Sequence, residues 1–270
     1  MLKPPGENPR ILVTNDDGIN APGLKVMEAI ARQLSDEVYV VAPEVNHSGA
    51  GHSLTLRRPL RTRRVSELHY AVDGTPTDCV LLALQNILVD KDINLILSGV
   101  NHGHNLGEDV TYSGTIAAAM EATLLQVPAI AFSQACRDRH PVKWKTAEHW
   151  APGIIRPMLA MEWPKDVLMN VNFPDVIVPS VKGVQVTRQG KQKIGDELIE
   201  RIDPRGEPYV WIGLSRGETS HADGTDVAAV RDGYVSVTPI QLDMTHHPSF
   251  AKLSKLLPSQ VNSAEFQPES

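Results

Sequence analysis

Short apolar runs alternate with amphipathic helical patterns from residue 11 to residue 132, and this alternation limits the possible fold more than any other feature. Strand-like runs are expected at Ile11–Thr14, Glu37–Ala42, Ile93–Leu97 and Ala129–Phe132. Helices are expected between them, over Pro22–Leu34, Thr75–Leu88 and Thr115–Leu125. This order predicts an α/β fold, a three-layer sandwich in which helices cover both faces of a mostly parallel sheet.

The pattern changes after about residue 178, where Pro and Gly become frequent and strand-like runs follow one another without helices between them. These runs are Gly183–Thr187, Tyr209–Ile212 and Tyr234–Thr238, with a turn at Asp203–Pro208. We therefore expect a Rossmann-like core over residues 10–178. Residues 179–270 are expected to form a β-rich C-terminal segment that acts as an oligomerisation arm and ends in a frayed tail.

Charge and composition exclude several classes of partner. The net charge of −6 provides no basic field, which argues against binding to duplex nucleic acid. No apolar run approaches the ~20 residues of a membrane span, and the N-terminus lacks the apolar region of a secretory signal. Cys79 and Cys136 are too few for a disulfide framework and fit a reducing compartment. We therefore expect a cytoplasmic protein, with Cys79 buried as a small apolar residue.

Polar residues follow three of the predicted strands, at the point where each strand ends. They are Asn15, Asp16 and Asp17 in the first loop, Asn46, His47 and Ser48 in the second, and Asn101, Asn105, Ser113, Gly114 and Thr115 in the third. Ligands of open parallel sheets bind at this edge. Carboxylate, amide and hydroxyl oxygens suit Mg²⁺, Mn²⁺ or Ca²⁺ better than zinc. The adjacent acids Asp16 and Asp17 repel each other, and a divalent cation is their predicted partner. The alternative is that Asp16 caps a turn and Asp17 is solvated, as in an isolated Asp pair.

The third loop leads directly into a predicted helix. Ser113 and Thr115 lie at its N-terminus, where free backbone N–H groups and the helix dipole favour an anion. Such hydroxyl residues also serve as ordinary N-caps. Beside a cation site, however, the same arrangement predicts a phosphate cradle, and the pair of sites suggests phosphoryl chemistry.

These motifs also allow three other interpretations. His102 and His104 form an HxH pair that could bind zinc, although hydrogen bonding to substrate or solvent fits the surrounding polar loop better. Asp16 could be the nucleophile of a haloacid-dehalogenase type phosphatase, but that class spaces its acids as DxD. A dinucleotide oxidoreductase is disfavoured because GxGxxG does not follow the first strand.

Six segments occur in a specific order along the chain: VTNDDGINAPG, VVAPEVNHSGAGHSLTL, DGTPTDCV, LILSGVNHGHNLGEDVTYSGTIAAAMEA, MNVNFP and GYVSVTPI. Together they resemble the stationary-phase survival protein SurE family, over about Arg10–Thr245. The resemblance implies a 5'-nucleotidase that uses one divalent metal cation per subunit, Mg²⁺ or Mn²⁺. Its implied substrates are nucleoside 5'-monophosphates, and some members of the family also cleave 3'-nucleotides and short polyphosphate.

The resemblance also implies roles for individual residues. Metal ligands would be Asp16, Asp17, Ser48 and Asn101, and phosphate contacts would be Asn105, Ser113, Gly114 and Thr115. In this mechanism Asp16, Asp17 and Asn105 are catalytic: water attacks phosphorus in line, with Asp17 as a candidate base, while a covalent aspartyl-phosphate on Asp16 is the alternative. Family members form dimers or tetramers by exchanging C-terminal segments, which agrees with the predicted arm. A nucleotide-binding regulator without turnover is the rival class of function.

Overall fold

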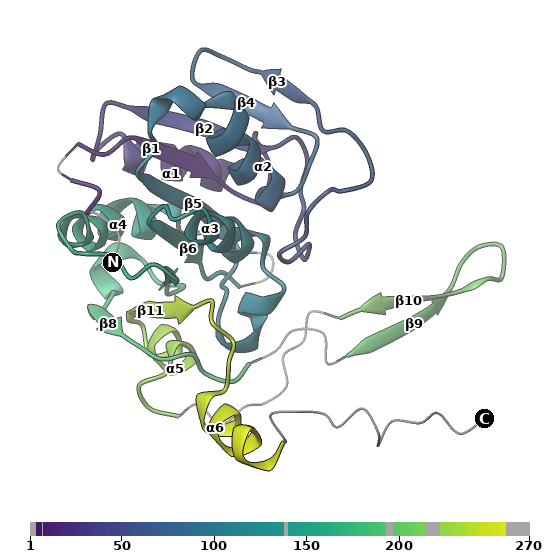
Figure 1. Ribbon diagram of the computed structural model, residues 1–270. Helices are drawn as coiled ribbons and strands as arrows, with labels where there is room; N and C mark the ends of the chain where they lie inside the picture. Colours follow the sequence, from purple (N-terminus) through teal and green to yellow (C-terminus); the bar gives the residue numbers. More distant parts are fainter. Residues whose placement is uncertain (1–3, 7, 138–139, 193–196, 214–221, 258–270) are drawn as a thin grey trace, which may run out of the picture. The chain divides into compact units, whose positions relative to one another are not determined.

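The computed structural model describes residues 4–6, 8–137, 140–192, 197–213 and 222–257, and its main element is a nine-stranded sheet. Figure 1 shows this sheet, running from β3 and β4 at the top to β11 and β8 at the bottom. In sheet order the strands are β3 (Thr62–Arg64), β4 (His69–Val72), β2 (Val38–Pro43), β1 (Ile11–Thr14), β5 (Leu95–His102), β6 (Ala129–Gln134), β7 (Val167–Phe173), β11 (Val235–Gln241) and β8 (Val184–Val186).

Most neighbouring strands run parallel, which confirms the predicted α/β fold. Parallel pairs are β1 with β2 and with β5, β2 with β4, β5 with β6, β6 with β7, and β8 with β11. The short edge strand β3 runs antiparallel to β4. Because the chain goes from β1 to β2 on one side and returns to β5 on the other, strand order reverses at β1. Ligand sites of open α/β sheets form at such a switch point.

Helices cover both faces of the sheet (Figure 1). On one face α1 (Pro22–Ala31) packs with α4 (Trp144–Met158), and on the other α2 (Pro76–Leu82) packs with α3 (Gly114–Leu124). Strand residues alternate between the faces. Ile11 and Val13 of β1 therefore join the core beneath α1 and α4, while Thr14 points to the opposite face.

Local sequence explains where these helices begin. Pro22 occupies the first turn of α1, where a missing N–H costs nothing. Thr75 and Asp78 form a reciprocal capping box at the start of α2. The helix predicted over Thr75–Leu88 is divided: α2 is followed by a π-helical turn, Ala83–Ile87, and a 3₁₀ turn, Val89–Lys91. Further 3₁₀ turns span Gly107–Thr111 and Val178–Ser180.

The strand predicted to end at Leu97 continues as β5 to His102. Its register against β6 shifts between Ser98 and Asn101. Gly99 makes this irregularity possible, because its φ is +130° and an added Cβ would lie 2.3 Å from the carbonyl oxygen of Phe132. Asn101 therefore lies on the sheet, paired with Ser133, rather than in the loop where the sequence analysis placed it.

The C-terminal segment contributes both to the sheet and to a separate hairpin. Two of its predicted strands are β8 and β11 of the main sheet, and the third is β10 (Pro208–Ile212). β10 pairs antiparallel with β9 (Leu198–Ile202) around a turn that contains Gly206, which confirms the turn predicted there. The expectation that no helix separates these strands is wrong, because α5 (Asp226–Arg231) lies between β10 and β11.

Residues 1–240 form one compact unit, and residues 241–270 form a second one that contains α6 (His247–Leu256). Fraying is predicted for about the last 20 residues; α6 extends into that stretch as far as Leu256, and residues 258–270 lie outside the described part of the chain. None of the helices in the described residues combines the length and apolar character that a membrane crossing requires.

Candidate metal and phosphate site

Asp16 and Asp17 follow β1 at the switch point, in a turn that Asn15 holds in place. The side-chain oxygen of Asn15 accepts a hydrogen bond from the N–H of Gly18 at 3.2 Å, and its Nδ2 donates to the Gly18 carbonyl at 3.1 Å. Gly18 has a φ of +102°, which favours glycine. The turn thus carries both acids to the edge of the sheet where β2 and β5 also end.

Asp16 is a buried carboxyl group, only 3% exposed. Burial raises its pKa to about 6; a hydrogen bond from Thr115 opposes that rise and the charge of Asp17 adds to it. In that bond Thr115 Oγ1 donates to Asp16 Oδ1 at 2.5 Å. A carboxylate held in this way gains most from a nearby positive charge.

Asp17 is half-buried and connects its own loop to the second loop and to the end of β5. Its Oδ1 accepts a hydrogen bond from Asn46 Nδ2 at 3.2 Å, and its Oδ2 accepts one from the backbone N–H of His102 at 3.1 Å. Burial raises the pKa of Asp17, while the His102 and Asn46 contacts lower it. Both adjacent acids are therefore destabilised as anions in the absence of a cation.

The second loop is attached to the same acids. The side-chain oxygen of Asn46, the residue that donates to Asp17, accepts a hydrogen bond from the N–H of Ser48 at 2.8 Å. The N–H of His47 donates to the carbonyl of Asp16 at 2.8 Å. These contacts place the loop that carries Ser48 against the paired acids, as the sequence analysis predicts.

Asn101 contributes an amide from β5. Its Nδ2 donates to the carbonyl of Gly103 at 3.0 Å, which leaves the side-chain oxygen as the atom suited to a cation. Within the described residues, no three His, Cys, Asp or Glu side chains gather to hold a metal ion. A cation here would depend on the two carboxylates and on neutral oxygens such as those of Ser48 and Asn101, a donor set that fits Mg²⁺ or Mn²⁺.

The two histidines of the HxH motif have different neighbours. The ring of His102 lies 6.4 Å from that of Trp144, tilted by 47°. Nε2 of His104 lies 3.1 Å from Nε2 of Gln192. His102 acts on Asp17 in two ways: its backbone N–H donates a hydrogen bond to Asp17, and the charge of its imidazole also lowers the pKa of Asp17.

The N-terminus of α3 lies directly against Asp16. A Cβ on Gly114 would come within 2.6 Å of the Cβ of Asp16, so glycine is needed for this close approach. Ser113 is the N-cap, and its hydroxyl oxygen accepts a hydrogen bond from the N–H of Ile116 at 3.1 Å. Ser113 therefore caps α3 in the ordinary way, and its hydroxyl proton is still able to donate to an anion.

Two contacts fasten the second loop, one to α3 and one to Tyr112, which precedes the N-cap of that helix. The N–H of Gly51 donates to the carbonyl of Tyr112 at 3.0 Å, and Nε2 of His52 lies 2.9 Å from a carboxylate oxygen of Glu121. The pairing of His52 with Glu121 was not predicted from the sequence, because a helical acid and a loop histidine far apart in the chain carry no local signal.

Asn105 is buried at 7% exposure and contacts side chains from two strands. Its partners are Ser133 on β6 and Asn170 and Asn172 on β7. These three residues were also missed. The available signal was the NxN spacing within MNVNFP, which puts two amides on one face of a strand otherwise composed of apolar residues.

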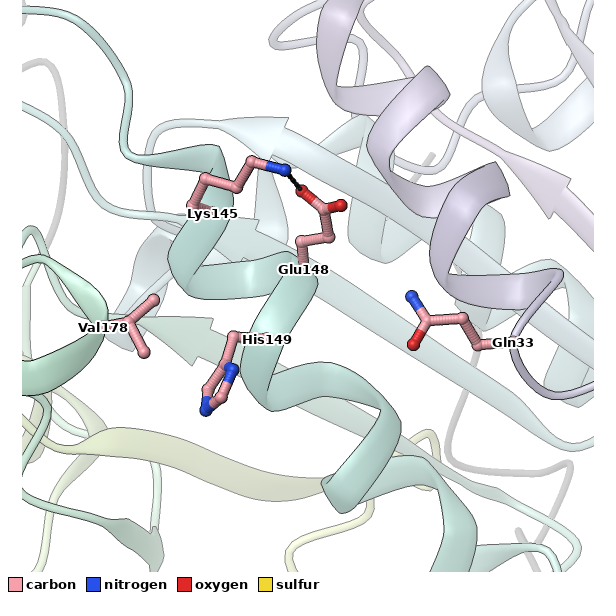
Figure 2. Close-up of a pocket in the computed structure, with 5 residues that line it drawn as sticks. All are labelled: Gln33, Lys145, Glu148, His149 and Val178. Carbon is pink, nitrogen blue, oxygen red and sulfur yellow. Dashed lines mark hydrogen bonds and ion pairs between the residues drawn. The ribbon is translucent and has the colours of Figure 1, made fainter.

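A separate hollow of about 390 Å³ lies beside α4 and contains none of the predicted site residues. Figure 2 shows its lining residues, Gln33, Lys145, Glu148, His149 and Val178. Lys145 Nζ and Glu148 Oε2, three residues apart on α4, pair with each other at 2.7 Å (Figure 2). This mutual pairing gives the hollow no clear charge with which to attract a ligand.

Comparisons with known proteins agree with the site. Residues 11–196 match the family model described as survival protein SurE. A protein named 5'-nucleotidase SurE from Paramagnetospirillum magneticum is 62% identical over 249 residues, covering 91% of this chain and 96% of the relative. A protein of the same name from Parvibaculum lavamentivorans is 51% identical and covers 95% of this chain and 94% of its own length.

Solved structures give the same result. The crystal structure of the SurE protein from Aquifex aeolicus superimposes with a TM-score of 0.80 at 41% sequence identity, covering 92% of this chain and 99% of that chain. The family resemblance in the sequence motifs and the predicted fold are both confirmed. The chain belongs to the SurE family.

Proposed function

We propose that this protein is a divalent-metal-dependent 5'-nucleotidase, a phosphoric monoester hydrolase that converts nucleoside 5'-monophosphates into nucleoside and phosphate. The name of its relatives, 5'-nucleotidase SurE, supports this function at 62% and 51% identity. The observation that carries the proposal is the contact between the paired acids and a helix N-terminus. Through Gly114 and Thr115, a site for a cation and a site for an anion lie side by side.

One Mg²⁺ or Mn²⁺ ion per subunit would be held by Asp16, Asp17, Ser48 and Asn101. When bound, the cation polarises a phosphoryl oxygen and makes a neighbouring water molecule more acidic. The protein's contribution is to hold both carboxyl groups in a fixed geometry. The hydrogen bonds from Thr115 to Asp16 and from Asn46 and His102 to Asp17 provide that orientation.

The anion side of the site would hold the phosphoryl oxygens. Free N–H groups at the start of α3, with the hydroxyl of Ser113 and the amide of Asn105, supply hydrogen-bond donors for charge that develops during phosphoryl transfer. The hydroxyl of Thr115 is already directed at Asp16, so Thr115 would contact phosphate through its backbone N–H.

Asp17 is the better candidate for the base that activates water. It is half-buried, whereas Asp16 is almost fully buried and one of its oxygens accepts the Thr115 hydroxyl. An attacking nucleophile needs an in-line path to phosphorus, which favours water over the buried Asp16 carboxylate. The stereochemistry at phosphorus separates the mechanisms: one in-line attack by water inverts the configuration of a chiral phosphoryl group, whereas the two displacements of a covalent aspartyl-phosphate pathway retain it.

Phosphate release from AMP, GMP and CMP, with and without Mn²⁺, tests the proposed function. The expected result is cation-dependent release that excess EDTA abolishes. 3'-AMP and tripolyphosphate in the same assay define whether the site also accepts these substrates. Binding of AMP without release from any of the nucleotides would contradict the proposal and indicate a nucleotide-binding regulator.

We also propose that the protein assembles as a homodimer or tetramer through its C-terminal segment. The β9–β10 hairpin exposes Val210, Trp211 and Ile212. In the second unit, α6 exposes Phe250, Leu253 and Leu256. The apolar side chains exposed on the hairpin and those exposed on the amphipathic helix each favour pairing with another copy of the chain.

A further inference from the structure

Three buried polar side chains on neighbouring strands converge on one loop residue, Asn105. Ser133 of β6 and Asn170 and Asn172 of β7 are each 0% exposed. Ser133 and Asn172 are register partners on adjacent parallel strands. Asn170 and Asn172 are two residues apart, so their side chains share one face of the sheet.

The two asparagines of β7 satisfy the backbone of Asn105. The N–H of Asn105 donates to Oδ1 of Asn172 at 2.8 Å. The carbonyl of Asn105 accepts from Nδ2 of Asn170 at 2.9 Å and from Nδ2 of Asn172 at 3.1 Å. The two amides are themselves joined, because Asn172 Nδ2 donates to Asn170 Oδ1 at 3.0 Å. A loop residue usually has no neighbouring backbone to bond its N–H and C=O. For Asn105, side chains of the sheet provide both hydrogen bonds.

Ser133 orients the side chain of the same residue. Nδ2 of Asn105 donates to Oγ of Ser133 at 2.8 Å. An amide nitrogen carries two protons, so this bond fixes the plane of the amide and leaves the second proton for another acceptor. The backbone and the side-chain plane of Asn105 are therefore both fixed, and one proton on its Nδ2 is left for another acceptor.

Packing alone does not account for this network. Each amide or hydroxyl removed from water costs free energy unless it is fully hydrogen-bonded. Replacing both partners of a buried hydrogen bond by apolar groups of similar shape can leave stability nearly unchanged. On the same face of these strands, Ala131 and Leu168 are apolar and fully buried, so this part of the sheet accommodates apolar residues.

We propose that Ser133, Asn170 and Asn172 are positioning residues, which hold Asn105 so that its remaining amide proton points at the substrate phosphoryl group. The inference rests on the proposed nucleotidase function and on the phosphate contact of Asn105. Transition-state stabilisation depends on donors placed before the reaction begins, and a displacement of about 1 Å can cost about 100-fold in rate. The network supplies that placement from rigid strands rather than from the loop itself.

Ser133→Ala is the mildest test, and the chain offers a matched control. Ser236 on β11 is equally buried, and its hydroxyl also bonds a side chain, Thr187 Oγ1 at 2.8 Å. We expect Ser133→Ala to lower kcat/KM for AMP by about 10- to 100-fold. Ser236→Ala should stay within about twofold of the wild type, because the Ser236 hydroxyl bonds Thr187 and Thr238 and no member of the Asn105 network. Equal kcat/KM values for the two variants would overturn the inference.

A double-mutant cycle separates positioning from a purely structural role. In an Asn105→Ala background, the group that Ser133 positions is absent, so adding Ser133→Ala should change kcat/KM by less than about twofold. Additive losses would mean that Ser133 acts independently of Asn105 and would contradict the proposal.

Hydrogen exchange provides a readout that needs no activity. The backbone N–H of Asn105 should exchange faster in Asn172→Ala, which removes its acceptor, and at the wild-type rate in Ser236→Ala. Unchanged exchange in Asn172→Ala would overturn the inference. If the wild type releases no phosphate from AMP, the proposed function fails, and affinity for inorganic phosphate in the presence of Mn²⁺ decides the inference instead. Weaker phosphate binding by Ser133→Ala than by Ser236→Ala supports it, and equal binding contradicts it.

Discussion

The hydroxyl of Thr115 donates a 2.5 Å hydrogen bond to the carboxylate of Asp16, across 99 residues of sequence. This contact joins the turn after β1, which carries the paired acids, to the first turn of α3, which provides the anion site. Thr115 is fully buried and Asp16 nearly so. The cation and anion halves of the candidate site are therefore connected by one buried bond.

Removing that bond should weaken metal binding while leaving the core packed. Thr115→Val keeps the shape of the side chain but no longer donates to Asp16. We expect a loss of roughly 1–3 kcal/mol in Mn²⁺ binding free energy, the value of a hydrogen bond to a charged group. Calorimetric titration measures it, with Thr115→Ser, which keeps the hydroxyl, as the control. Wild-type Mn²⁺ affinity in Thr115→Val would refute this role.

A single methyl group at Gly114 should disrupt the site. Its Cβ would lie 2.6 Å from the Cβ of Asp16, and no flexible side-chain end is available to yield. Gly114→Ala should therefore lower kcat/KM by at least about tenfold, because Asp16 or the start of α3 has to move. Gly153→Ala is the matched control: this glycine lies inside α4 with no atom within 4 Å of an added Cβ. Phosphate release from AMP is measured for both variants. Equal kcat/KM values would show that the close approach of Gly114 to Asp16 is unimportant.

The metal requirement should be absolute. Excess EDTA should abolish phosphate release from AMP, and Mn²⁺ or Mg²⁺ should restore it. Asp17→Asn keeps the size of the side chain but removes one of the two charges that attract the cation, so it should lower kcat sharply with the fold intact. Circular dichroism checks the fold. Full activity in chelator, or wild-type kcat in Asp17→Asn with saturating Mn²⁺, is incompatible with this assignment.

The metal-free protein should lose stability as pH rises. The folded-state pKa of Asp16 is about 6, against an ordinary 3.8, so folding favours the protonated form. The contribution of protonated Asp16 to the free energy of unfolding is fully present below about pH 3.8, and it is lost as the pH rises through about 6. The difference of about two pKa units corresponds to roughly 3 kcal/mol.

Asp16→Asn isolates this effect because it cannot titrate. In EDTA, the unfolding free energy of the wild type relative to Asp16→Asn should fall between pH 4 and pH 7, and Mn²⁺ at pH 7 should reverse the fall. Urea denaturation at several pH values measures both. A difference between the two proteins that does not vary with pH would mean that Asp16 is not destabilised by burial.

Assembly should depend on the hairpin. Trp211 on β10 is 63% exposed and lies beside Tyr209, with ring centroids 6.4 Å apart. Trp211→Glu should shift the protein towards smaller species in light scattering, because a charge opposes burial of this surface. Val89→Glu is the control: Val89 is 60% exposed and lies outside the C-terminal segment, so this substitution should not change the molecular mass of the assembly. A wild-type protein that is monomeric at micromolar concentration would contradict the proposed assembly.

Much of the site could be predicted because each polar residue follows an apolar strand, and the ends of parallel strands meet at one edge. Asp16, Asp17 and the loop of Ser48 come together for this reason. Asn101 was placed correctly at this edge but in the wrong local structure, since β5 continues past the irregularity at Gly99.

The missing elements have physical causes. No helix was predicted where α4 lies because Pro152 and Pro157 fall inside it, and proline normally ends a helical pattern. No strand was predicted at β7 because Asn170 and Asn172 interrupt its apolar run, yet tertiary hydrogen bonds to Asn105 satisfy both. The His52–Glu121 pair depends on a long-range contact that no local pattern reveals.

A crystal structure with Mn²⁺ and inorganic phosphate tests the central claim most directly, because manganese gives an anomalous signal that identifies its position. The account predicts one anomalous peak in contact with both Asp16 and Asp17, and a phosphate between that peak and the N-terminus of α3. A manganese ion bound elsewhere, or a phosphate away from the first turn of α3, would contradict the account.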